Sequence, residues 1–226
     1  MRKFDFWQLA AILALLIFGL TVIRSVSAEL FPLQLIFALA SLFIYLLISR
    51  VNYLNFSTLF WPLYLSSLIL LVSPFIFGIV SRGSLRWIVI GPLFIQPSEF
   101  ARPLLILAFS SLAARFSRPL GLKHIFLILL LYLPPAALVY LQPDLGSTLV
   151  ISAGIISVII SSGIKPKHLL LGSLTLLLLL PLSYSALQDY QKDRLRIFIN
   201  PYLDPLNKGY NAIQATIAVG SGGILG

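Results

Sequence analysis

Residues 30–49 read LFPLQLIFALASLFIYLLIS, twenty residues without a charged side chain. That is about the length an α-helix needs to cross the hydrocarbon core of a bilayer. Because backbone polar groups in lipid must be bonded within their own segment, repeated runs of this kind predict an all-α, polytopic helical membrane protein. A β-barrel would show short segments of alternating polarity, and none appears. We expect seven spans in a single transmembrane domain, at residues 7–23, 30–49, 58–80, 100–114, 125–141, 145–164 and 169–187.

The composition excludes several other classes of protein. A mean hydropathy of +0.99 and a charged fraction of 10% rule out an ordinary water-soluble domain. The absence of cysteine excludes disulfides and thiolate sites, and two histidines far apart in sequence cannot build a zinc site. A metal would therefore be held by oxygen. The net charge of +9 comes from cations placed singly between apolar runs, which favours membrane orientation and an anionic substrate over nucleic acid.

Basic residues set the orientation. With the N-terminus in the cytoplasm, eight cations fall in inner segments and four in outer connections, as the positive-inside rule requires. The inner set is Arg2, Lys3, Arg50, Arg115, Arg118, Lys123, Lys165 and Lys167, and the outer set is Arg24, Arg82, Arg86 and Arg102. An alternative for the first helix is a cleaved signal peptide, since Val26, Ser27 and Ala28 resemble a cleavage site. A retained helix is favoured because six further spans follow.

Acidic residues gather on one side of the membrane. Of the seven acids only Asp5 falls inside, and the outer ones are Glu29, Glu99, Asp144, Asp189, Asp193 and Asp204. A solvated rim would explain any one of them. As a set they indicate a polar cavity open to the outer leaflet, because ionisable groups near a bilayer tend to face cavities or substrates.

The first polar cluster at that face is SRGSLRWIVIGPLFIQPSEFARP, residues 81–103. Its glycines and prolines break helix, so we expect a structured loop that returns into the membrane. Arg86 and Trp87 fit a snorkelling cation beside an interfacial aromatic. Ser98 is placed to cap a helix that begins at Glu99. Capping does not exclude a second role for Glu99 in binding a ligand.

A second cluster is LQPDLGSTL, residues 141–149. Here Asp144 is expected to cap the next helix, which is a supporting role. Farther along, residues 187–198 place apolar and cationic side chains on different sides of a helical wheel, as in a helix that lies in the interface. Residues 188–226 are expected to form an outer-face loop and the start of an eighth span.

The third cluster, INPYLDPLNKGYNAIQ at residues 199–214, places Asp204 between two prolines. Asp204 followed by Pro205 fits an N-cap with proline at the first helical position. Prolines also stiffen the backbone that precedes them. This stiffness, together with the glycine, tyrosine and glutamine that follow at short spacing, favours a functional role for Asp204.

Together these segments resemble the SEDS family (shape, elongation, division and sporulation), the bacterial peptidoglycan polymerases that include RodA and FtsW. The resemblance spans nearly the whole chain. It depends on RWIVIGPLFIQPSEFARP, QPDLGST, DYQKDRLRIFINPYLDPLNKGY and QATIAVGSGGILG, which occur in the family's order. The segments YQKDRL and AVGSGG resemble the RodA branch more closely than the FtsW branch.

The resemblance implies a glycosyltransferase that joins lipid II units at the outer face of the bacterial inner membrane during cell-wall elongation. It assigns the catalytic carboxylate to Asp204, as general base toward a sugar hydroxyl, and implies cations that stabilise the departing pyrophosphate. It also implies a class B penicillin-binding protein as partner. The expected substrate-binding residues are Arg86, Trp87, Glu99, Arg102, Arg194, Arg196 and Lys208. A divalent cation, Mg²⁺ or Mn²⁺, would suit oxygen ligands there, although no ligand spacing defines a metal site.

The chain departs from the family pattern at several positions. Arg102 stands where lysine is usual and is followed by Pro103, Asn207 stands where glycine is usual, and Asn211 stands where glutamine is usual. The family has about ten spans of some 20 residues each. We expect this chain to reach only the opening of the eighth, so the resemblance implies a fragment whose missing helices would wall the cavity. It does not imply activity for these residues alone.

Two rival functions belong to other classes. A lipid-linked oligosaccharide flippase or transporter predicts ionisable groups and broken helices at the bilayer midplane, whereas the charges here lie at one face. A non-catalytic membrane scaffold for cell-wall enzymes predicts that the outer charges recruit partners and leave sugar polymerisation unchanged.

Overall fold

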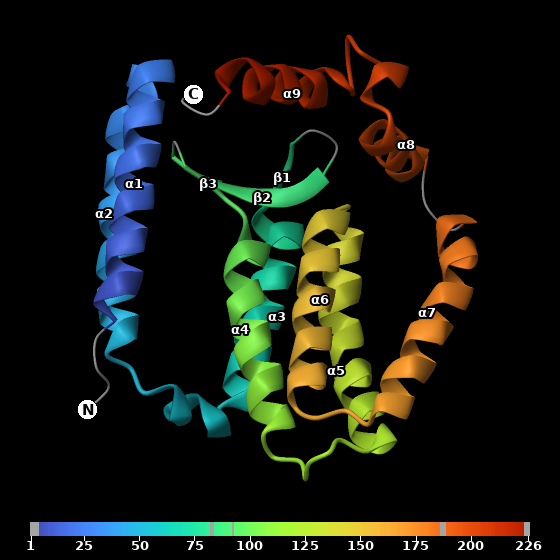
Figure 1. The fold of residues 1–226 in the computed structure, drawn as a ribbon. Coiled ribbons are helices and arrows are strands. Elements are labelled where there is room, and N and C mark those ends of the chain that lie inside the picture. The colour runs from blue at the N-terminus through green and yellow to red at the C-terminus, as the bar shows by residue number, and fades with distance from the viewer. Residues whose placement is uncertain (1–4, 82–83, 92, 186–188, 224–226) are drawn as a thin grey trace. The chain divides into compact units, whose positions relative to one another are not determined.

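The computed structural model describes residues 5–81, 84–91, 93–185 and 189–223. Helices dominate these residues, with one small sheet (Figure 1). The chain divides into two compact units, Met1–Gly163 and Ile164–Gly226. The elements are α1 (Phe6–Val26), η1 (Ala28–Leu30), α2 (Phe31–Ser49), η2 (Tyr53–Thr58), α3 (Phe60–Phe77), β1 (Ile79–Ser81), β2 (Ser84–Ile90), β3 (Leu93–Ile95), α4 (Pro97–Ala113), α5 (Leu122–Leu141), α6 (Leu145–Ser161), α7 (Pro166–Ser185), α8 (Asp189–Ile199), η3 (Pro201–Leu203) and α9 (Tyr210–Gly222), where η marks a 3-10 helix.

The all-α class predicted from the apolar runs is confirmed. Helices α1 to α7 overlap the seven predicted ranges. Within the part of the chain that the structure describes, α1, α2 together with η1, α3 and α5 are long and apolar enough to cross a membrane. Helices α4 and α6 are shorter, with 17 residues each.

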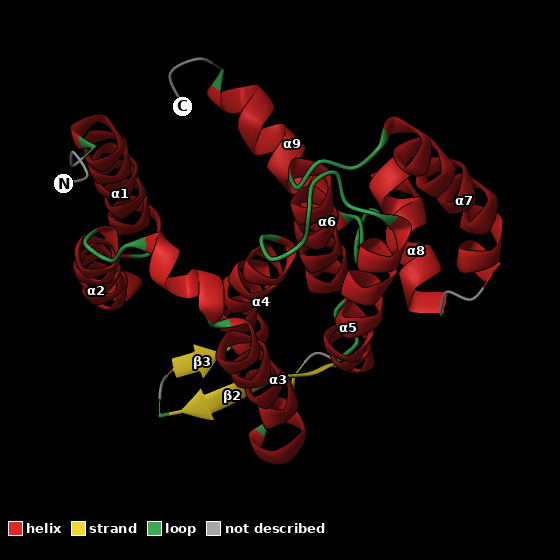
Figure 2. Ribbon diagram, turned by 90° about the horizontal axis from the view of Figure 1, so that it is seen from below, coloured by secondary structure: helices red, strands yellow, loops and turns green. Residues whose placement is uncertain are grey.

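Helices α3 to α6 form a bundle (Figures 1 and 2). The rings of Phe60, Tyr64 and Phe109 meet at its centre with centroids 5.4 to 6.1 Å apart, a spacing typical of favourable aromatic pairs. Gly154 lets α6 approach α4 closely, because a Cβ there would lie 3.1 Å from Ile106. Other fully buried side chains in this core are Leu71, Leu105, Ile128, Ile151 and Ile155.

The first polar cluster contains a three-stranded antiparallel sheet with the order β1-β2-β3. The structured loop expected at residues 81–103 therefore consists in part of strands. Its segment SLRWIVI is rich in β-branched and aromatic residues, which favour strands. Gly91 turns the chain between β2 and β3 with a φ of +60°, so that Ile90 pairs with Leu93. Strand β2 lies against α3 and α4, and the sheet lies at one end of the bundle (Figure 1).

The second unit contains α7, α8, η3 and α9. The amphipathic helix predicted for residues 187–198 corresponds to α8, Asp189–Ile199. The interpretation of Asp204 as the N-cap of a helix that begins at Pro205 was wrong, because residues 205–209 form turns and α9 begins at Tyr210. The amide of Gly209 donates to the carbonyl oxygen of Asp204 at 2.9 Å and closes a turn where the first helical turn was expected.

Candidate functional site

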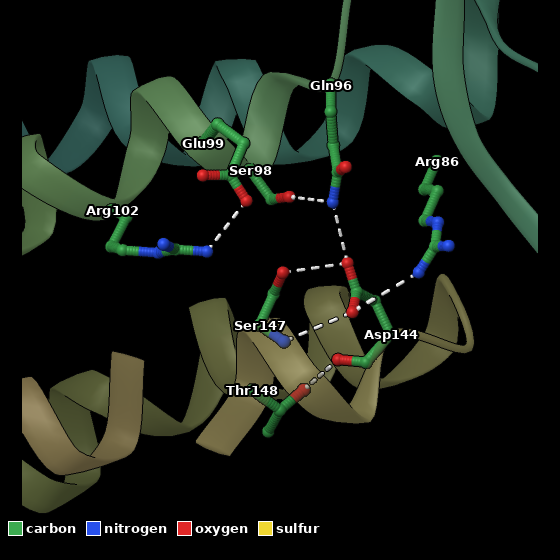
Figure 3. A network of polar contacts seen from close by, with 8 residues as sticks. All are labelled: Arg86, Gln96, Ser98, Glu99, Arg102, Asp144, Ser147 and Thr148. Atoms are coloured by element: carbon green, nitrogen blue, oxygen red, sulfur yellow. Dashed lines mark hydrogen bonds and ion pairs between the residues drawn. The ribbon is translucent and has the colours of Figure 1, made fainter. Parts of the chain in front are cut away.

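Asp144 is the centre of a polar network in the first unit (Figure 3). It immediately precedes α6, and its Oδ1 accepts a hydrogen bond from the backbone amide of Ser147 at 3.1 Å. The Ser147 hydroxyl donates to Oδ2 at 2.8 Å. The predicted N-cap at Asp144 is therefore confirmed, and the hydroxyl adds a second bond from the same residue.

Two residues that precede α4 reach the same carboxylate. Nε2 of Gln96 donates to Oδ2 of Asp144 at 2.7 Å and to the hydroxyl of Ser98 at 3.0 Å. From β2, Nη1 of Arg86 lies 3.4 Å from Oδ1. The side chain of Asp144 is only 7% exposed, and a buried carboxylate is stable only when it is paired and hydrogen-bonded. The network thus holds β2, the start of α4 and the start of α6 together.

The predicted cap at Ser98 was wrong. Helix α4 begins at Pro97, and Gln96 occupies the N-cap position without a side-chain cap. Proline is favoured at the first helical position because its missing N–H would be unpaired there in any case. Ser98 therefore lies inside the first turn, where its hydroxyl is buried and accepts the bond from Gln96.

Glu99 and Arg102 form an ion pair one turn apart on α4. Nη2 of Arg102 lies 2.7 Å from Oε1 of Glu99. The side chain of Glu99 is 51% exposed and that of Arg102 is 26% exposed, so the pair is open to a ligand on one side. Nε of Arg102 is buried and has no hydrogen-bond partner among the residues that the structure describes. Arg102 keeps the positive charge that lysine would carry at this position, and its guanidinium pairs with Glu99.

Arg86 and Trp87 are adjacent on β2 and partly buried. The guanidinium carbon of Arg86 lies 5.9 Å from the ring centroid of Trp87, within the range of a cation–π contact. The indole also meets Phe94 of β3 edge to face, with the centroids 6.4 Å apart. The ring on one side and Asp144 on the other hold the guanidinium in one orientation. About a quarter of the Arg86 side chain stays exposed, with a fraction of 24%.

Asp204, the predicted catalytic residue, lies in a tight turn of the second unit. Its Oδ1 accepts from Nδ2 of Asn207 at 3.1 Å, and its Oδ2 accepts from the backbone amide of Lys208 at 3.3 Å. Asn200 stabilises the preceding turn by accepting from the amide of Tyr202 at 3.1 Å. Gly209 is required by close packing, since a Cβ there would lie 2.0 Å from the carbonyl oxygen of Pro201. The hydrogen bonds from Asn207 and Lys208 fix the carboxylate of Asp204 in place. Because Asp204 is partly exposed, solvent still reaches it.

The cations predicted in this unit lie mostly beside another acid. Nζ of Lys208 lies 2.6 Å from Oδ2 of Asp193, and Nη1 of Arg196 lies 3.9 Å from Oδ1 of the same residue. The hydrogen bond from Lys208 lowers the pKa of Asp193, and the same bond raises the pKa of Lys208. The side chain of Arg194 lies outside the described part of the structure.

The structure therefore gathers the predicted residues into two sets. One set combines Arg86 and Trp87 with the Glu99–Arg102 pair around the start of α4, and the other combines Asp204 with Lys208 and Arg196. Sequence reasoning did not single out Gln96, Ser147 or Asp193 as binding partners. Gln96 and Asp144 are polar residues in two motifs, but nothing local to either motif reports that their side chains meet.

The described residues contain no group of three or more histidine or acidic side chains that could hold a metal ion. In the first unit Arg86 pairs with Asp144 and Arg102 with Glu99, and in the second Lys208 contacts both Asp193 and Asp204.

Comparison with known proteins gives consistent matches over most of the chain. The profile of the FtsW/RodA/SpoVE family, described as cell cycle proteins, matches residues 6–226. The peptidoglycan glycosyltransferase MrdB of Escherichia coli strain K12 is 34% identical over 165 residues, which cover 73% of this chain and 45% of that protein. The probable peptidoglycan glycosyltransferase FtsW of Legionella pneumophila is 30% identical, covering 99% of this chain and 60% of that protein. The chain thus spans less than two thirds of the length of these relatives.

Solved structures share the fold. A chain from a peptidoglycan synthase complex, in which polymerization and crosslinking are coordinated, matches with a TM-score of 0.81 and 34% identity. That match covers 99% of this chain and 67% of the other. The crystal structure of the rod shape determining protein RodA of Thermus thermophilus matches with a TM-score of 0.65 and 31% identity, over 78% of this chain and 60% of that one.

Proposed function

Because this chain belongs to the FtsW/RodA/SpoVE family, we propose that it forms part of a peptidoglycan glycosyltransferase that polymerises lipid II. Two relatives are named as enzymes of this kind, and a similar solved chain belongs to a peptidoglycan synthase complex. The helices suited to crossing a membrane and the charges at one predicted face support a reaction at the outer surface of the inner membrane, during cell-wall elongation.

The observation that supports this function most strongly is the fixed, partly exposed carboxylate of Asp204. Polymerisation requires the oxygen of a sugar hydroxyl to attack the anomeric carbon of a second sugar. The bond from that carbon to the lipid pyrophosphate breaks, and its electron pair leaves with the pyrophosphate. A carboxylate takes the hydroxyl proton as general base, which is worth about 10² to 10⁴ in rate. In this proposal Asp204 is that base.

The leaving pyrophosphate needs preorganised positive charge. Arg86 meets this need, because Asp144 and Trp87 fix its guanidinium while part of the side chain stays exposed. Arg102 offers a second cation beside the exposed carboxylate of Glu99. A divalent cation, held in part by the exposed carboxylate of Glu99, would supply further positive charge for the leaving group. We assign Arg86 and Trp87 to substrate binding, and Arg102 with Glu99 to the edge of that site.

The remaining parts of the proposal concern orientation and partner. The distribution of Lys and Arg supports a cytoplasmic N-terminus. A polymerase makes strands that must then be crosslinked, and the similar synthase complex couples both activities. The matching partner would be a class B penicillin-binding protein that supplies the transpeptidase.

The test is reconstitution of the full-length protein in liposomes that contain labelled lipid II. A polymerase converts the label to glycan strands that a muramidase digests. Transbilayer movement of labelled lipid II without polymer would replace this function by a flippase. Neither movement nor polymer, with recruitment of cell-wall enzymes intact, would favour a scaffold.

A further inference from the structure

Lys208 contacts two acids, one in its own turn and one on α8. Its ammonium lies 2.6 Å from Oδ2 of Asp193, which is on α8, fifteen residues earlier in the chain. Its backbone amide donates to Oδ2 of Asp204 at 3.3 Å. A single residue thus connects α8 to the carboxylate that we assign as the general base.

Hydrogen bonds and close packing hold the residues of the Asp204 turn together. The carbonyl oxygen of Asp204 accepts from the amide of Gly209, and the amide of Tyr210 donates to the carbonyl oxygen of Asn207. Gly209 also packs directly on Pro201 and leaves no space for a Cβ. Holding Lys208 in place therefore holds the whole turn, including Asp204.

We propose that Asp193 is a positioning residue, which anchors the Asp204 turn to α8 through the ammonium of Lys208. This inference rests on the proposed function, since the anchor matters to the reaction only if Asp204 is its base. It also gives Lys208 a role beyond the one expected of it, because its ammonium engages Asp193 and not only a substrate anion. Both side chains are partly exposed, at 36% for Asp193 and 57% for Lys208, so the anchor tightens the turn without being essential for folding.

Two measurements on the full-length protein test the proposal, and the first does not depend on activity. Asp193→Asn removes the charge and keeps the shape. We expect the backbone amides of Lys208 and Gly209 to exchange with deuterium faster by up to about fivefold, the upper limit for an exposed ion pair. Glu29→Gln, which removes an exposed carboxylate from the first unit, is the matched control and leaves this exchange unchanged.

The second measurement is the rate of lipid II polymerisation. Asp193→Asn should lower kcat by up to about fivefold and leave KM unchanged. Lys208→Met removes the other half of the ion pair and should have the same effect on kcat and on amide exchange, and combining it with Asp193→Asn should add little to either single change. A role for Lys208 in pyrophosphate binding predicts instead that Lys208→Met raises KM while Asp193→Asn does not.

These measurements test the role of Asp193 separately from the proposed polymerase function. Unchanged amide exchange in Asp193→Asn overturns the anchor, and so does a double variant, Asp193→Asn with Lys208→Met, whose exchange is much faster than that of either single variant. A wild-type protein that makes no polymer overturns the proposed function, while the exchange data still decide whether Asp193 holds the turn.

Discussion

The guanidinium of Arg86 lies 3.4 Å from the carboxylate of Asp144, although the two residues belong to β2 and to the N-terminal cap of α6. The contact is shielded from solvent on the side of Asp144, whose side chain is 7% exposed. Asp144 therefore has two roles: it stabilises this end of the bundle, and it orients the side chain of Arg86.

Asp144→Ala should destabilise the protein by roughly 3 to 5 kcal/mol, because it leaves Arg86 unpaired and removes the acceptor of Gln96 and Ser147. Asp144→Asn should cost less, since one oxygen still accepts from the amide of Ser147. Chemical unfolding in detergent, followed by tryptophan fluorescence, measures the difference. Glu99→Gln at the exposed pair is the control and should cost at most about 1 kcal/mol. Equal stability of Asp144→Ala and wild type would contradict the network.

Gly209→Ala should disturb the turn of Asp204, because its Cβ would meet the carbonyl oxygen of Pro201 at 2.0 Å. A shift of roughly 1 Å at a reacting group can cost about 100-fold in rate. We therefore expect loss of most lipid II polymerisation with normal membrane insertion. Gly19→Ala, at a position in α1 with no described heavy atom within 4 Å of a Cβ, should polymerise at the wild-type rate. Full activity in both variants would show that the turn is not tightly packed.

Gly154→Leu should separate α4 from α6, because even a Cβ would lie 3.1 to 3.2 Å from the side chain of Ile106. Overpacking of this kind costs about 1 to 3 kcal/mol. Thermal unfolding in detergent should show the loss, and Gly172→Leu, where the described structure leaves open space around a Cβ, should not. An equal effect of the two substitutions would argue against close packing at Gly154.

The Asp193–Lys208 pair makes the stability of this unit depend on pH, with a sign that follows from the two pKa shifts. The pKa of Asp193 is lowered from 3.8, so its contribution to stability is present above pH 3.8 and is lost as the pH falls through the pKa of the folded state. The pKa of Lys208 is raised from 10.5, so its contribution to stability is present below pH 10.5 and is lost as the pH rises through the pKa of the folded state. An NMR titration of the Asp193 carboxyl should give a midpoint below 3.8 that returns toward 3.8 in Lys208→Met. A midpoint unaffected by Lys208→Met would mean that the pair does not form in solution.

The fold class and several local features could be predicted from the sequence because they depend on local patterns. Uninterrupted apolar runs define membrane helices, and Asp144 caps α6 because the carboxylate and the amide and hydroxyl that donate to it lie within four residues. The strand signal in SLRWIVI was also local, but the surrounding glycines and prolines were interpreted as a loop.

The contacts that define the site could not be predicted in the same way. The bonds from Gln96 to Asp144 and from Lys208 to Asp193 join segments that are 48 and 15 residues apart. Such pairs depend on how helices and strands pack, which single motifs do not encode. Asp204 itself was identified through the family resemblance, while its N-cap interpretation failed because Gly209 closes a turn in place of a helix.

The most direct test of the central claim is lipid II polymerisation by the full-length protein with Asp204→Asn. Asparagine keeps a side-chain oxygen that can accept from the amide of Lys208, so the turn should survive while the base is lost. We predict that the rate falls at least about 100-fold, with expression and membrane insertion unchanged. Polymer formation at the wild-type rate would show that Asp204 only supports the turn and would remove it from the mechanism.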